Sequence, residues 1–493
     1  MRIIYLIHKV AGLEIDQTAK SERWKTQNLM KSVTCHEIPY VCDCTGLFDA
    51  IRDMPEAIWL DSGRPTSSQG NIDIISSSAD IIIETKGDTS TIFDSQGTTQ
   101  STKDPFDLAH EILEPLQPIR AGHENLAFTG GLLGFFGYDL GRRFIEIPDL
   151  TKEAVDLPDM RIGRFLWALI VDHDEQVAKI IIHENCSAQL RNEVLDRLKK
   201  SKQVDCELAG EFALTAKFSA TLGADEYLNN IEQIKEYINS GDCYQTNFAQ
   251  HFSAPYLGDE WNAYLKLRKV VAAPYSAFWK WRDRAILSMS PERFLKVSKH
   301  ESAGGFTVES KPIKGTIPRG KSSEEDVKNA EILRNSQKDR AENVMIVDLL
   351  RNDLSKNCTP GSVTVPTLFA LETFPNVHHL VSTVIGKLSP TSSALDVLRD
   401  AFPGGSITGA PKKRAMEIIE QLEPLKRSVY CGSIGYISTN GRMDTNIAIR
   451  TVLASNQNMH CWGGGGIVAD SMPSDELAES INKISIIMTT LEA

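Results

Sequence analysis

The sequence lacks any apolar run near the roughly 20 residues that a membrane-spanning helix requires. Its first ten residues, MRIIYLIHKV, also lack the longer apolar stretch and the small-residue cleavage site of a secretory signal. We therefore interpret this segment as a first strand, and we expect a soluble, cytoplasmic protein without a membrane partner.

An excess of basic residues is missing as well. Lys and Arg total 53 against 65 Asp and Glu, which gives a formal net charge of −12. Because binding to nucleic-acid phosphates needs a basic face, this charge argues against a nucleic-acid partner. An anionic small substrate would need local cations or a metal ion to bind within such a field.

Paired cysteine motifs are absent too. The nine cysteines are scattered without a CxxC pair, and the nearest two are Cys42 and Cys44. An odd number in this arrangement is typical of reduced thiols in the cytosol, and it argues against a disulfide framework or a zinc site.

The first half of the chain has the pattern of strands and turns. Residues 61–104 alternate turns rich in Ser, Thr and Gly with short β-branched runs, and residues 164–184 predict a hairpin that turns at DHDEQ. Residues 192–202 predict a helix, after which periodicity is weak. We therefore place a domain boundary near residue 215, with domains at 1–215 and 216–493.

The second half has longer helical patterns. A helix near 224–240 precedes a strand that begins near Cys243, and residues 324–356 predict one long helix. Strands are expected around 377–388, and Asn440–Gly441 predicts a hairpin between SIGYIST and MDTNIAIRTVLAS. A closing helix covers the last residues. Because the strands come in hairpins and not in regular βαβ repeats, we predict an α+β fold of largely antiparallel sheets flanked by helices.

Two helices carry pairs of acidic residues. Asp339 and Glu342 are three apart in one helix, Glu476 and Glu479 repeat that spacing in the closing helix, and Lys483 follows four residues later. If the helices converge, their carboxylates are suitable ligands for Mg²⁺. The same spacing is also typical of a solvated helix face with an ordinary Glu–Lys pair.

Two glycine-rich segments are candidates for binding an anion. Residues 402–414, FPGGSITGAPKKR, lack the order of a P-loop but place a loop before a helix, where backbone N–H groups can hold a carboxylate. Residues 461–471, CWGGGGIVADS, put four glycines in a strand, where backbone can approach a ligand closely. A tight turn or a bulge explains either segment equally well.

Four single residues remain ambiguous by themselves. Lys314 lies in the restricted segment SKPIKGTIPRG, and Glu292 precedes an apolar strand. His378 and His379 lie in a strand and therefore point to opposite faces. Each is also typical of a structural residue: a surface lysine, a solvated glutamate or a hydrogen-bonded core histidine.

Taken together, these segments resemble the chorismate-utilising enzymes, which include anthranilate, aminodeoxychorismate, isochorismate and salicylate synthases. The resemblance covers residues 225–493, and GGLLGFFGYDLGRR extends it more weakly to the first half. The motifs that carry it, in chain order, are SPERF, PIKGT, AENVMIVDLLRNDL, HHLVST, PGGSITGAPK, GSIGY, DTNIAIRT and GGGIVADS.

The lysine in PIKGT resembles the nucleophile of the aminodeoxychorismate synthases, because anthranilate synthases have PIAGT there. The resemblance implies that Lys314 attacks C2 of chorismate and that ammonia later replaces it by entering at C4. Two alternatives stay open: an anthranilate synthase, and a catalytically silent subunit that binds an aromatic metabolite.

The resemblance also implies the other roles. Glu292 would act as the general acid, with His379 near the reacting ring. Glu342 and Glu479 would bind Mg²⁺, with Asp339 and Glu476 beside them. The substrate would be bound by Arg450, Tyr430, Thr408, Gly464, Gly465, Gly466, Lys483 and Gln245. Gln245 stands where isochorismate and salicylate synthases have a base lysine, which argues for amination over hydration.

Two further partners are implied. The chain shows no glutaminase motif of the type GxCxGxQ, so a separate glutaminase subunit would supply ammonia. Family members of this type also bind tryptophan away from the active site. The matching positions are Ser62, Gln69, Gly70, Asn71, Ile72, Pro274, Tyr275 and Ser276, although QGNI departs from the usual aromatic and basic pattern.

Overall fold

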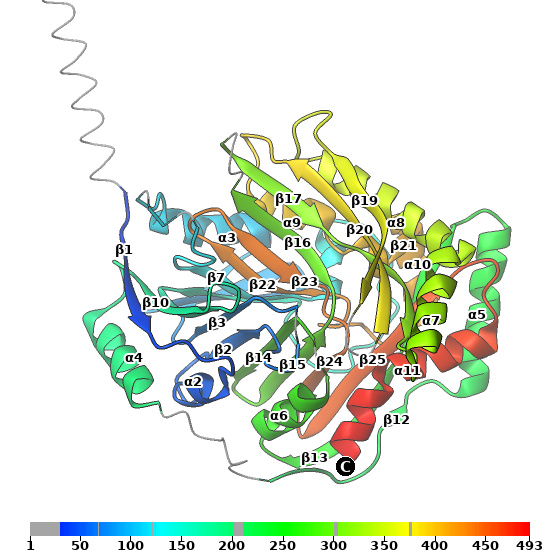
Figure 1. The fold of residues 1–493 in the computed structure, drawn as a ribbon, viewed down its shortest axis with the longest axis horizontal. Helices are drawn as coiled ribbons and strands as arrows, with labels where there is room; N and C mark the ends of the chain where they lie inside the picture. Colours follow the sequence, from blue (N-terminus) through cyan, green and yellow to red (C-terminus); the bar gives the residue numbers. More distant parts are fainter. Residues whose placement is uncertain are drawn as a thin grey trace, which may run out of the picture.

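The computed structural model describes residues 30–67, 69–120, 122–123, 125–201, 211–271, 273–299, 304–373 and 377–493. Two large sheets form the body of the molecule, and helices cover their edges and outer faces (Figure 1). The strand predicted for residues 1–10 lies outside the described residues. Within the part of the chain described above, no helix is long and apolar enough to cross a membrane.

The first sheet has 13 strands, and its main path is β1-β10-β9-β3-β2-β14-β15-β24-β25-β13-β11, with β12 and β21 paired to β13. Neighbouring strands are antiparallel throughout. Its strands are β1 (Val33–Ile38), β2 (Ile58–Asp61), β3 (Ile72–Ser76), β9 (Trp167–Asp172), β10 (Val177–His183), β11 (Phe212–Leu214), β12 (Ser219–Ala220), β13 (Gln245–Gly258), β14 (Tyr275–Trp281), β15 (Arg284–Ser290), β21 (Gly409–Ala410), β24 (Thr451–Ser455) and β25 (Asn458–Ile467).

The second sheet has 12 strands in the order β18-β20-β17-β16-β23-β22-β7-β8-β4-β5-β6, with β19 paired to β20. It is also antiparallel. Its strands are β4 (Ile81–Lys86), β5 (Thr89–Asp94), β6 (Gly97–Ser101), β7 (Gly131–Phe136), β8 (Met160–Phe165), β16 (Arg293–Lys299), β17 (Phe306–Ser310), β18 (Ile313–Pro318), β19 (Thr364–Thr373), β20 (Val377–Lys387), β22 (Ser433–Ser438) and β23 (Met443–Asn446).

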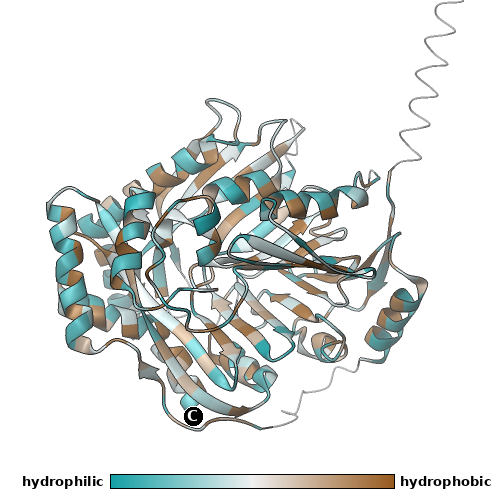
Figure 2. Cartoon of the chain, turned by 180° about the vertical axis from the view of Figure 1, so that it is seen from behind, coloured by the Kyte–Doolittle hydropathy of each residue, from teal (hydrophilic) through white to brown (hydrophobic). Residues whose placement is uncertain are grey.

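The helices show mixed hydrophilic and hydrophobic bands, as expected for helices with one face against a sheet (Figure 2). The helices α7, α8, α10 and α11 lie on one side of the molecule, together with α5 (Figure 1). The described helices are α2 (Thr45–Asp49), α3 (Pro105–Leu113), α4 (Ala188–Lys200), α5 (Ala224–Asn239), α6 (Glu260–Val270), α7 (Ser323–Asn335), α8 (Gln337–Ser355), α9 (Ala394–Ala401), α10 (Lys412–Leu422) and α11 (Pro473–Glu492), with short 3₁₀ helices η1 (Glu114–Leu116), η2 (Tyr138–Arg143) and η3 (Gly405–Ile407).

The antiparallel α+β fold class predicted from the sequence is confirmed. The DHDEQ hairpin joins β9 to β10, the Asn440–Gly441 turn joins β22 to β23, and the closing helix is α11. Each sheet contains strands from both sides of residue 215: β2 pairs with β14 in the first sheet, and β7 pairs with β22 in the second. The predicted boundary therefore does not separate one sheet from the other.

The prediction of a single helix over 324–356 is wrong. Ser336 takes an extended conformation, which ends α7, and its hydroxyl accepts a hydrogen bond from the Asp339 N–H to begin α8. A serine at this position caps the first turn of a new helix. The helices on both sides of the break, α7 and α8, contact β18 and β20 of the second sheet.

The predicted strand after the Asn440–Gly441 hairpin is also two strands. β23 ends at Asn446 in the second sheet and β24 begins at Thr451 in the first, so residues 447–450 cross between the sheets. A similar crossing lies at Pro291–Glu292, between β15 and β16. A buried aromatic contact also joins the sheets, because the ring centroids of Phe135 on β7 and Trp279 on β14 are 6.2 Å apart.

Candidate active site

The two crossings lie beside each other and hold two of the predicted site residues. The Ile447 N–H donates to the Glu292 carbonyl oxygen at 3.0 Å, and the Met289 N–H donates to the Arg450 carbonyl oxygen at 3.0 Å. Ser290 Oγ also donates to the Ile447 carbonyl oxygen at 2.6 Å. Backbone hydrogen bonds thus fix Glu292 and Arg450 at the junction of the sheets.

Lys314 lies on β18, the edge strand of the second sheet. Gly315 follows it with φ +93°, a conformation that favours glycine, and a Cβ atom there would lie 3.0 Å from Asp339 Cβ. The strand therefore packs closely against the first turn of α8, which brings Lys314 to the same helix as Glu342. Its Nζ donates to the Ser406 carbonyl oxygen at 3.3 Å.

The surroundings of Lys314 favour a neutral amine. Burial lowers its pKa, and the positive charge of Lys483 lowers the pKa further, against the opposing charge of Glu342. A lower pKa raises the fraction of lysine that has a free electron pair at neutral pH. Lys314 is half-buried, so it does not face bulk solvent as an ordinary surface lysine would.

Glu292 has the properties of a proton donor. Only 7% of the residue is exposed, and burial raises the pKa of its carboxyl from 4.5 to about 7, although Lys314 acts to lower it. Ser406 and the backbone of Ile313 also form hydrogen bonds with the carboxylate. A substantial fraction of Glu292 is therefore protonated at neutral pH, as a general acid requires.

His379 faces the site from β20, directly opposite Thr316 on β18. Thr316 Oγ1 and His379 Nδ1 are 2.7 Å apart, and burial lowers the pKa of this histidine to about 4, with Arg450 adding to the effect. His379 is therefore neutral at pH 7. The adjacent His378 contacts Asp326 instead, at 3.0 Å, so the two histidines point to opposite faces as predicted.

Glu342 on α8 and Glu476 and Glu479 on α11 form an acidic cluster. Burial raises the pKa of Glu342, and the negative charges of Asp339 and Glu476 contribute to the increase. The pKa of Glu479 is lowered, because Lys483 and Lys338 outweigh the effect of its burial. Lys483 Nζ lies 2.7 Å from Glu479 Oε1.

The acidic cluster opens onto the glycine strand β25. A Cβ atom at Gly465 would lie 3.2 Å from Glu476 Oε2, 3.5 Å from Glu479 Oε1 and 3.5 Å from Lys483 Nζ. The missing side chain therefore leaves room beside two carboxylates for a small group. Two helical carboxylates with such a space fit Mg²⁺, which retains several water ligands.

The cluster is wider than a closed metal site. Among the described residues, just one group of His, Cys, Asp or Glu side chains has three ligand atoms within 4.8 Å of one another, and it consists of Cys44, Asp73 and His173. The predicted Mg²⁺ ligands thus offer a partial shell, which substrate and water would complete.

Arg450 is a half-buried cation with φ +50° at the end of the second crossing. Burial lowers its pKa, and no carboxylate among the described residues lies within 4 Å of its guanidinium. A desolvated guanidinium without a protein counter-ion is well suited to bind an anionic ligand in a bidentate geometry.

The other predicted substrate contacts surround the end of β25. Lys483 Nζ donates to the Gly464 carbonyl oxygen at 3.0 Å. Gln245 packs its amide against Gly466, where a Cβ atom would lie 1.8 Å from Nε2, and its buried Oε1 has no hydrogen-bond partner. A buried acceptor without a partner is costly, and a ligand with a donor would satisfy it.

Thr408 and Tyr430 are held by the protein itself. The Thr408 hydroxyl donates to the Gly404 carbonyl oxygen at 3.0 Å. Tyr430 is buried and stacks on Trp462 with ring centroids 6.0 Å apart. Thr408 thus lies in the loop before α10, and Tyr430 packs against β25 at Trp462, directly before the four glycines.

The positions predicted to bind tryptophan line a separate cavity of about 510 Å³. Its wall also contains Arg293, which directly follows Glu292, and several other charged side chains. Seven of the eight predicted positions line it: Gln69, Gly70, Asn71, Ile72, Pro274, Tyr275 and Ser276.

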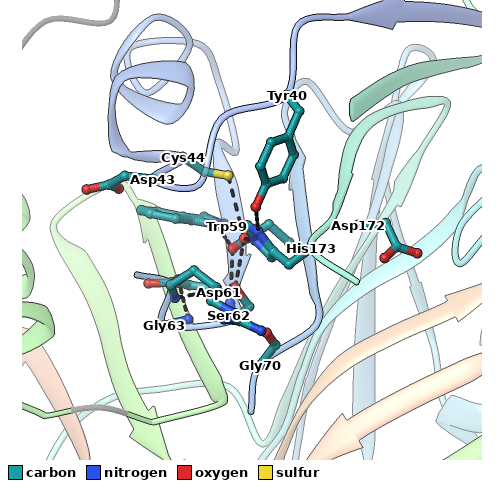
Figure 3. A network of polar contacts seen from close by, with 12 residues as sticks. Tyr40, Asp43, Cys44, Trp59, Asp61, Ser62, Gly63, Gly70, Asp172 and His173 are labelled. Carbon is teal, nitrogen blue, oxygen red and sulfur yellow. Dashed lines mark hydrogen bonds and ion pairs between the residues drawn. The ribbon is translucent and has the colours of Figure 1, made fainter. Parts of the chain in front are cut away.

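Ser62, the eighth position, is turned toward a buried polar network instead (Figure 3). Its N–H and Oγ donate to Asp73 at 3.0 and 2.8 Å, and Asp73 also accepts from Trp59 Nε1 at 2.8 Å. His173 Nε2 lies 2.5 Å from the same carboxylate. This network fixes the strand β2 that borders the cavity.

The sequence alone does not single out two residues of the site. Ser406 connects Lys314 with Glu292, but nothing in its spacing distinguishes it within the loop. Lys338 lies 3.5 Å from Glu476, and its position four residues before Glu342 on one helix is a usable signal. Because the sequence does not show that a new helix begins after Ser336, it also does not show that Lys338 lies in a first helical turn.

Known proteins are similar to this chain in sequence and in fold. The family model described as "chorismate binding enzyme" matches residues 56–489. Aminodeoxychorismate synthase component 1 of Escherichia coli is 44% identical over 90% of this chain and 95% of its own length. Anthranilate synthase component 1 of Aquifex aeolicus is 32% identical over 88% of this chain and 89% of its length. The crystal structure of anthranilate synthase component I from Streptococcus pneumoniae, 30% identical, covers 86% of this chain and 93% of its own with a TM-score of 0.74.

Proposed function

Because this chain belongs to the chorismate-binding enzyme family, we propose that it converts chorismate and ammonia to 4-amino-4-deoxychorismate, as component I of an aminodeoxychorismate synthase. The relative named for this activity is 44% identical, whereas the anthranilate synthase from Aquifex aeolicus is 32% identical. The product would enter the synthesis of p-aminobenzoate and folate, and we expect the enzyme to act in the cytoplasm.

The observation that carries the proposal is the position of Lys314. The lysine donates to the carbonyl oxygen of Ser406, whose side chain hydrogen-bonds to the partly protonated Glu292, and it interacts electrostatically with Glu342 and Glu479. An anthranilate synthase has no need of an amine there, because ammonia itself attacks the ring. The second candidate, anthranilate synthesis, lacks a role for this residue.

The reaction divides into two substitutions. The neutral amine of Lys314 attacks C2 of chorismate, both double bonds of the ring diene shift by one bond, and the C4 hydroxyl leaves as water with a proton from Glu292. Ammonia then forms a bond to C4 while the bond between C2 and the lysine nitrogen breaks. In each step one group bonds to one of these two carbons while another group leaves the other carbon. The amine therefore ends at C4, the carbon that lost the hydroxyl.

The charged residues around the site would hold the two substrate carboxylates. Arg450, Lys483 and the backbone of Gly464–Gly466 are the groups that we assign to them, with Gln245, Thr408 and Tyr430 shaping the pocket. Glu342 and Glu479 would hold Mg²⁺, supported by Asp339 and Glu476. When bound, the metal would polarise the ring carboxylate as a Lewis acid.

Gln245 and His379 restrict the competing reaction with water. Gln245 has no basic atom that could activate water, and burial lowers the pKa of His379 to about 4, which makes its neutral imidazole a weak base. We infer that water is therefore a poor nucleophile in this site, and that ammonia must reach it from a separate glutaminase subunit. The relatives' name "component 1" supports the existence of such a second component.

We also propose that the 510 Å³ cavity binds tryptophan. Tyr275 and Ile72 offer apolar surface, and the wall also carries charged side chains, of which Asp61 pairs with Arg268 and Arg293 pairs with Asp444. Since Ser62 is turned away toward Asp73, the binding would depend on the other seven positions. Calorimetric titration of the purified chain with tryptophan tests this proposal.

The decisive experiment uses chorismate, Mg²⁺ and ammonium, with products identified by mass spectrometry. We expect aminodeoxychorismate from the wild-type chain and a chorismate-derived adduct on the peptide that contains Lys314. Lys314→Ala should reduce formation of aminodeoxychorismate at least about 100-fold. The exposed Lys321, substituted in the same way, is the control that should retain activity. Accumulation of anthranilate by the wild-type chain, or an unchanged rate in Lys314→Ala, would defeat the proposal.

A further inference from the structure

Lys338 is a cation at the solvent side of the acidic cluster. It lies in the first turn of α8, and its Nζ is 3.5 Å from Glu476 Oε1 on α11. Its side chain is 49% exposed, whereas that of Glu476 is 4% exposed. Lys338 also interacts electrostatically with Glu342 and Glu479. One lysine thus faces all three glutamates.

The three glutamates need positive charge nearby when no divalent cation is bound, because buried carboxylates that repel one another destabilise the fold. Two other lysines are near, but both have further contacts within the site. Lys314 donates to the Ser406 carbonyl oxygen, and Lys483 donates to the Gly464 carbonyl oxygen and pairs with Glu479. Lys338 has its described polar contact with Glu476 alone, and its half-exposed side chain can extend into solvent.

We propose that Lys338 is the counter-ion of the metal-free acidic cluster and that it lowers the affinity of this site for Mg²⁺. The inference rests on the proposed function, because it takes Glu342 and Glu479 as the metal ligands. A divalent cation beside these carboxylates repels the ammonium group, so Lys338 must move away when the metal binds. The energy of its pair with Glu476 is then lost, and the apparent affinity for Mg²⁺ is reduced.

The chain contains a closely matched control on the same helix. Lys356, the C-cap residue of α8, lies 3.6 Å from Asp353 Oδ1, with side-chain exposures of 48% and 3%, and it also donates to the Asp400 carbonyl oxygen at 3.1 Å. The pair therefore has the distance and burial of the Lys338–Glu476 pair, but it lies outside the acidic cluster. Lys356→Met removes the same charge from the helix without removing it from the proposed metal site.

Titration calorimetry with magnesium chloride alone, at low ionic strength, compares the Mg²⁺ affinities of the wild-type chain, Lys338→Met, Lys338→Arg and Lys356→Met. We expect Lys338→Met to bind Mg²⁺ about 5- to 10-fold more tightly than the wild type, and the other two variants to bind as the wild type does. The increase in melting temperature on adding Mg²⁺ should be largest in Lys338→Met, and the difference should shrink at high salt.

An affinity in Lys338→Met equal to or weaker than that in Lys356→Met would overturn the role of Lys338 and leave the proposed reaction intact. A wild-type chain that binds no Mg²⁺ would overturn both the metal site and the counter-ion. The titration needs neither chorismate nor turnover, so its result does not depend on whether the chain forms aminodeoxychorismate.

Discussion

The buried carboxyl of Glu292 reduces the stability of the fold at high pH, where it has to ionise inside the protein. Its pKa is raised by burial from 4.5 to about 7, so the folded protein retains a proton that the unfolded chain has already released. Stability is therefore unaffected by this group below pH 4.5, decreases as the pH rises from 4.5 to 7, and remains reduced above 7. The difference corresponds to roughly 3 kcal/mol.

Glu292→Gln should consequently be more stable than the wild type at pH 8, by on the order of 1–3 kcal/mol, and of similar stability at pH 4. Denaturant unfolding at both pH values measures the difference. Equal stability of the two proteins at pH 8 would show that this carboxyl ionises near its ordinary pKa.

The same substitution should slow the reaction, because Gln cannot donate a proton to the departing hydroxyl. We expect a decrease of about 10²- to 10⁴-fold in turnover. For the wild type, kcat/KM should fall as the pH rises above about 7, since the acid form of Glu292 is needed. The falling limb should be absent from the residual activity of Glu292→Gln, and a limb that persists there belongs to another group.

At the scale of single residues, most of the proposed site follows from the resemblance to the chorismate-utilising enzymes. That resemblance points to Lys314, Glu292, Glu342 and Glu479, and the fold brings the charges of these four residues together. Ser406 and Lys338 are not predicted in this way, because their contacts with Lys314 and Glu476 depend on which segments of the chain meet in the fold. Every residue has a backbone carbonyl oxygen, so the sequence cannot show which one accepts a hydrogen bond from Lys314.

At the scale of elements, the pairing of β18 with α8 determines where Lys314 lies. Gly315 has φ +93°, and a Cβ atom there would lie 2.9 Å from Leu333 Cδ1 as well as 3.0 Å from Asp339. Both the backbone conformation and the close packing therefore require glycine. A side chain would push the strand away from the helix.

Gly315→Ala should destabilise the fold by about 1–3 kcal/mol and reduce turnover at least about tenfold, because it displaces Lys314 from Ser406 and Glu342. Gly361→Ala is the matched control: φ is +77° there, but no atom lies within 4 Å of the added Cβ. The control should lose some stability and keep full turnover per folded molecule. Equal effects on turnover would mean that strain, and not displacement of β18, is responsible.

The elements that the sequence predicts correctly are those with a strong local signal. The β9–β10 and β22–β23 hairpins follow from their turns, and α11 follows from its apolar spacing. The break at Ser336 is missed because helical spacing continues on both sides of it. The crossing at 447–450 is missed because an apolar run reads as one strand even when its halves join different sheets.

At the scale of the molecule, neither half of the chain can complete a sheet alone. Separating the chain near residue 215 would uncover β14 where β2 pairs with it, and β22 where β7 pairs with it. The large core cluster would also divide, since Phe135 and Trp279 come from opposite halves. Uncovered strand edges and apolar surface favour aggregation.

Residues 216–493 expressed alone should therefore fail to form a cooperatively folded domain, despite containing every proposed catalytic residue. Thermal unfolding and size-exclusion chromatography, with the full chain as reference, measure this. Co-expression with residues 1–215 should restore soluble protein. A sharp, reversible unfolding transition of 216–493 alone would show that the predicted domain boundary is also a folding boundary.

The hydrogen bond between Ile447 and Glu292 connects the two places where the chain passes from one sheet to the other. Remodelling a loop cannot relocate either the acid or the nearby guanidinium without disturbing hydrogen bonding in both layers. New chemistry on this scaffold must therefore come from what surrounds that fixed pair: the edge strand with its lysine, the two acidic helices, and the glutamine beside the glycine strand. We therefore expect substitutions at those surrounding positions, and not at the central pair, to change which reaction takes place.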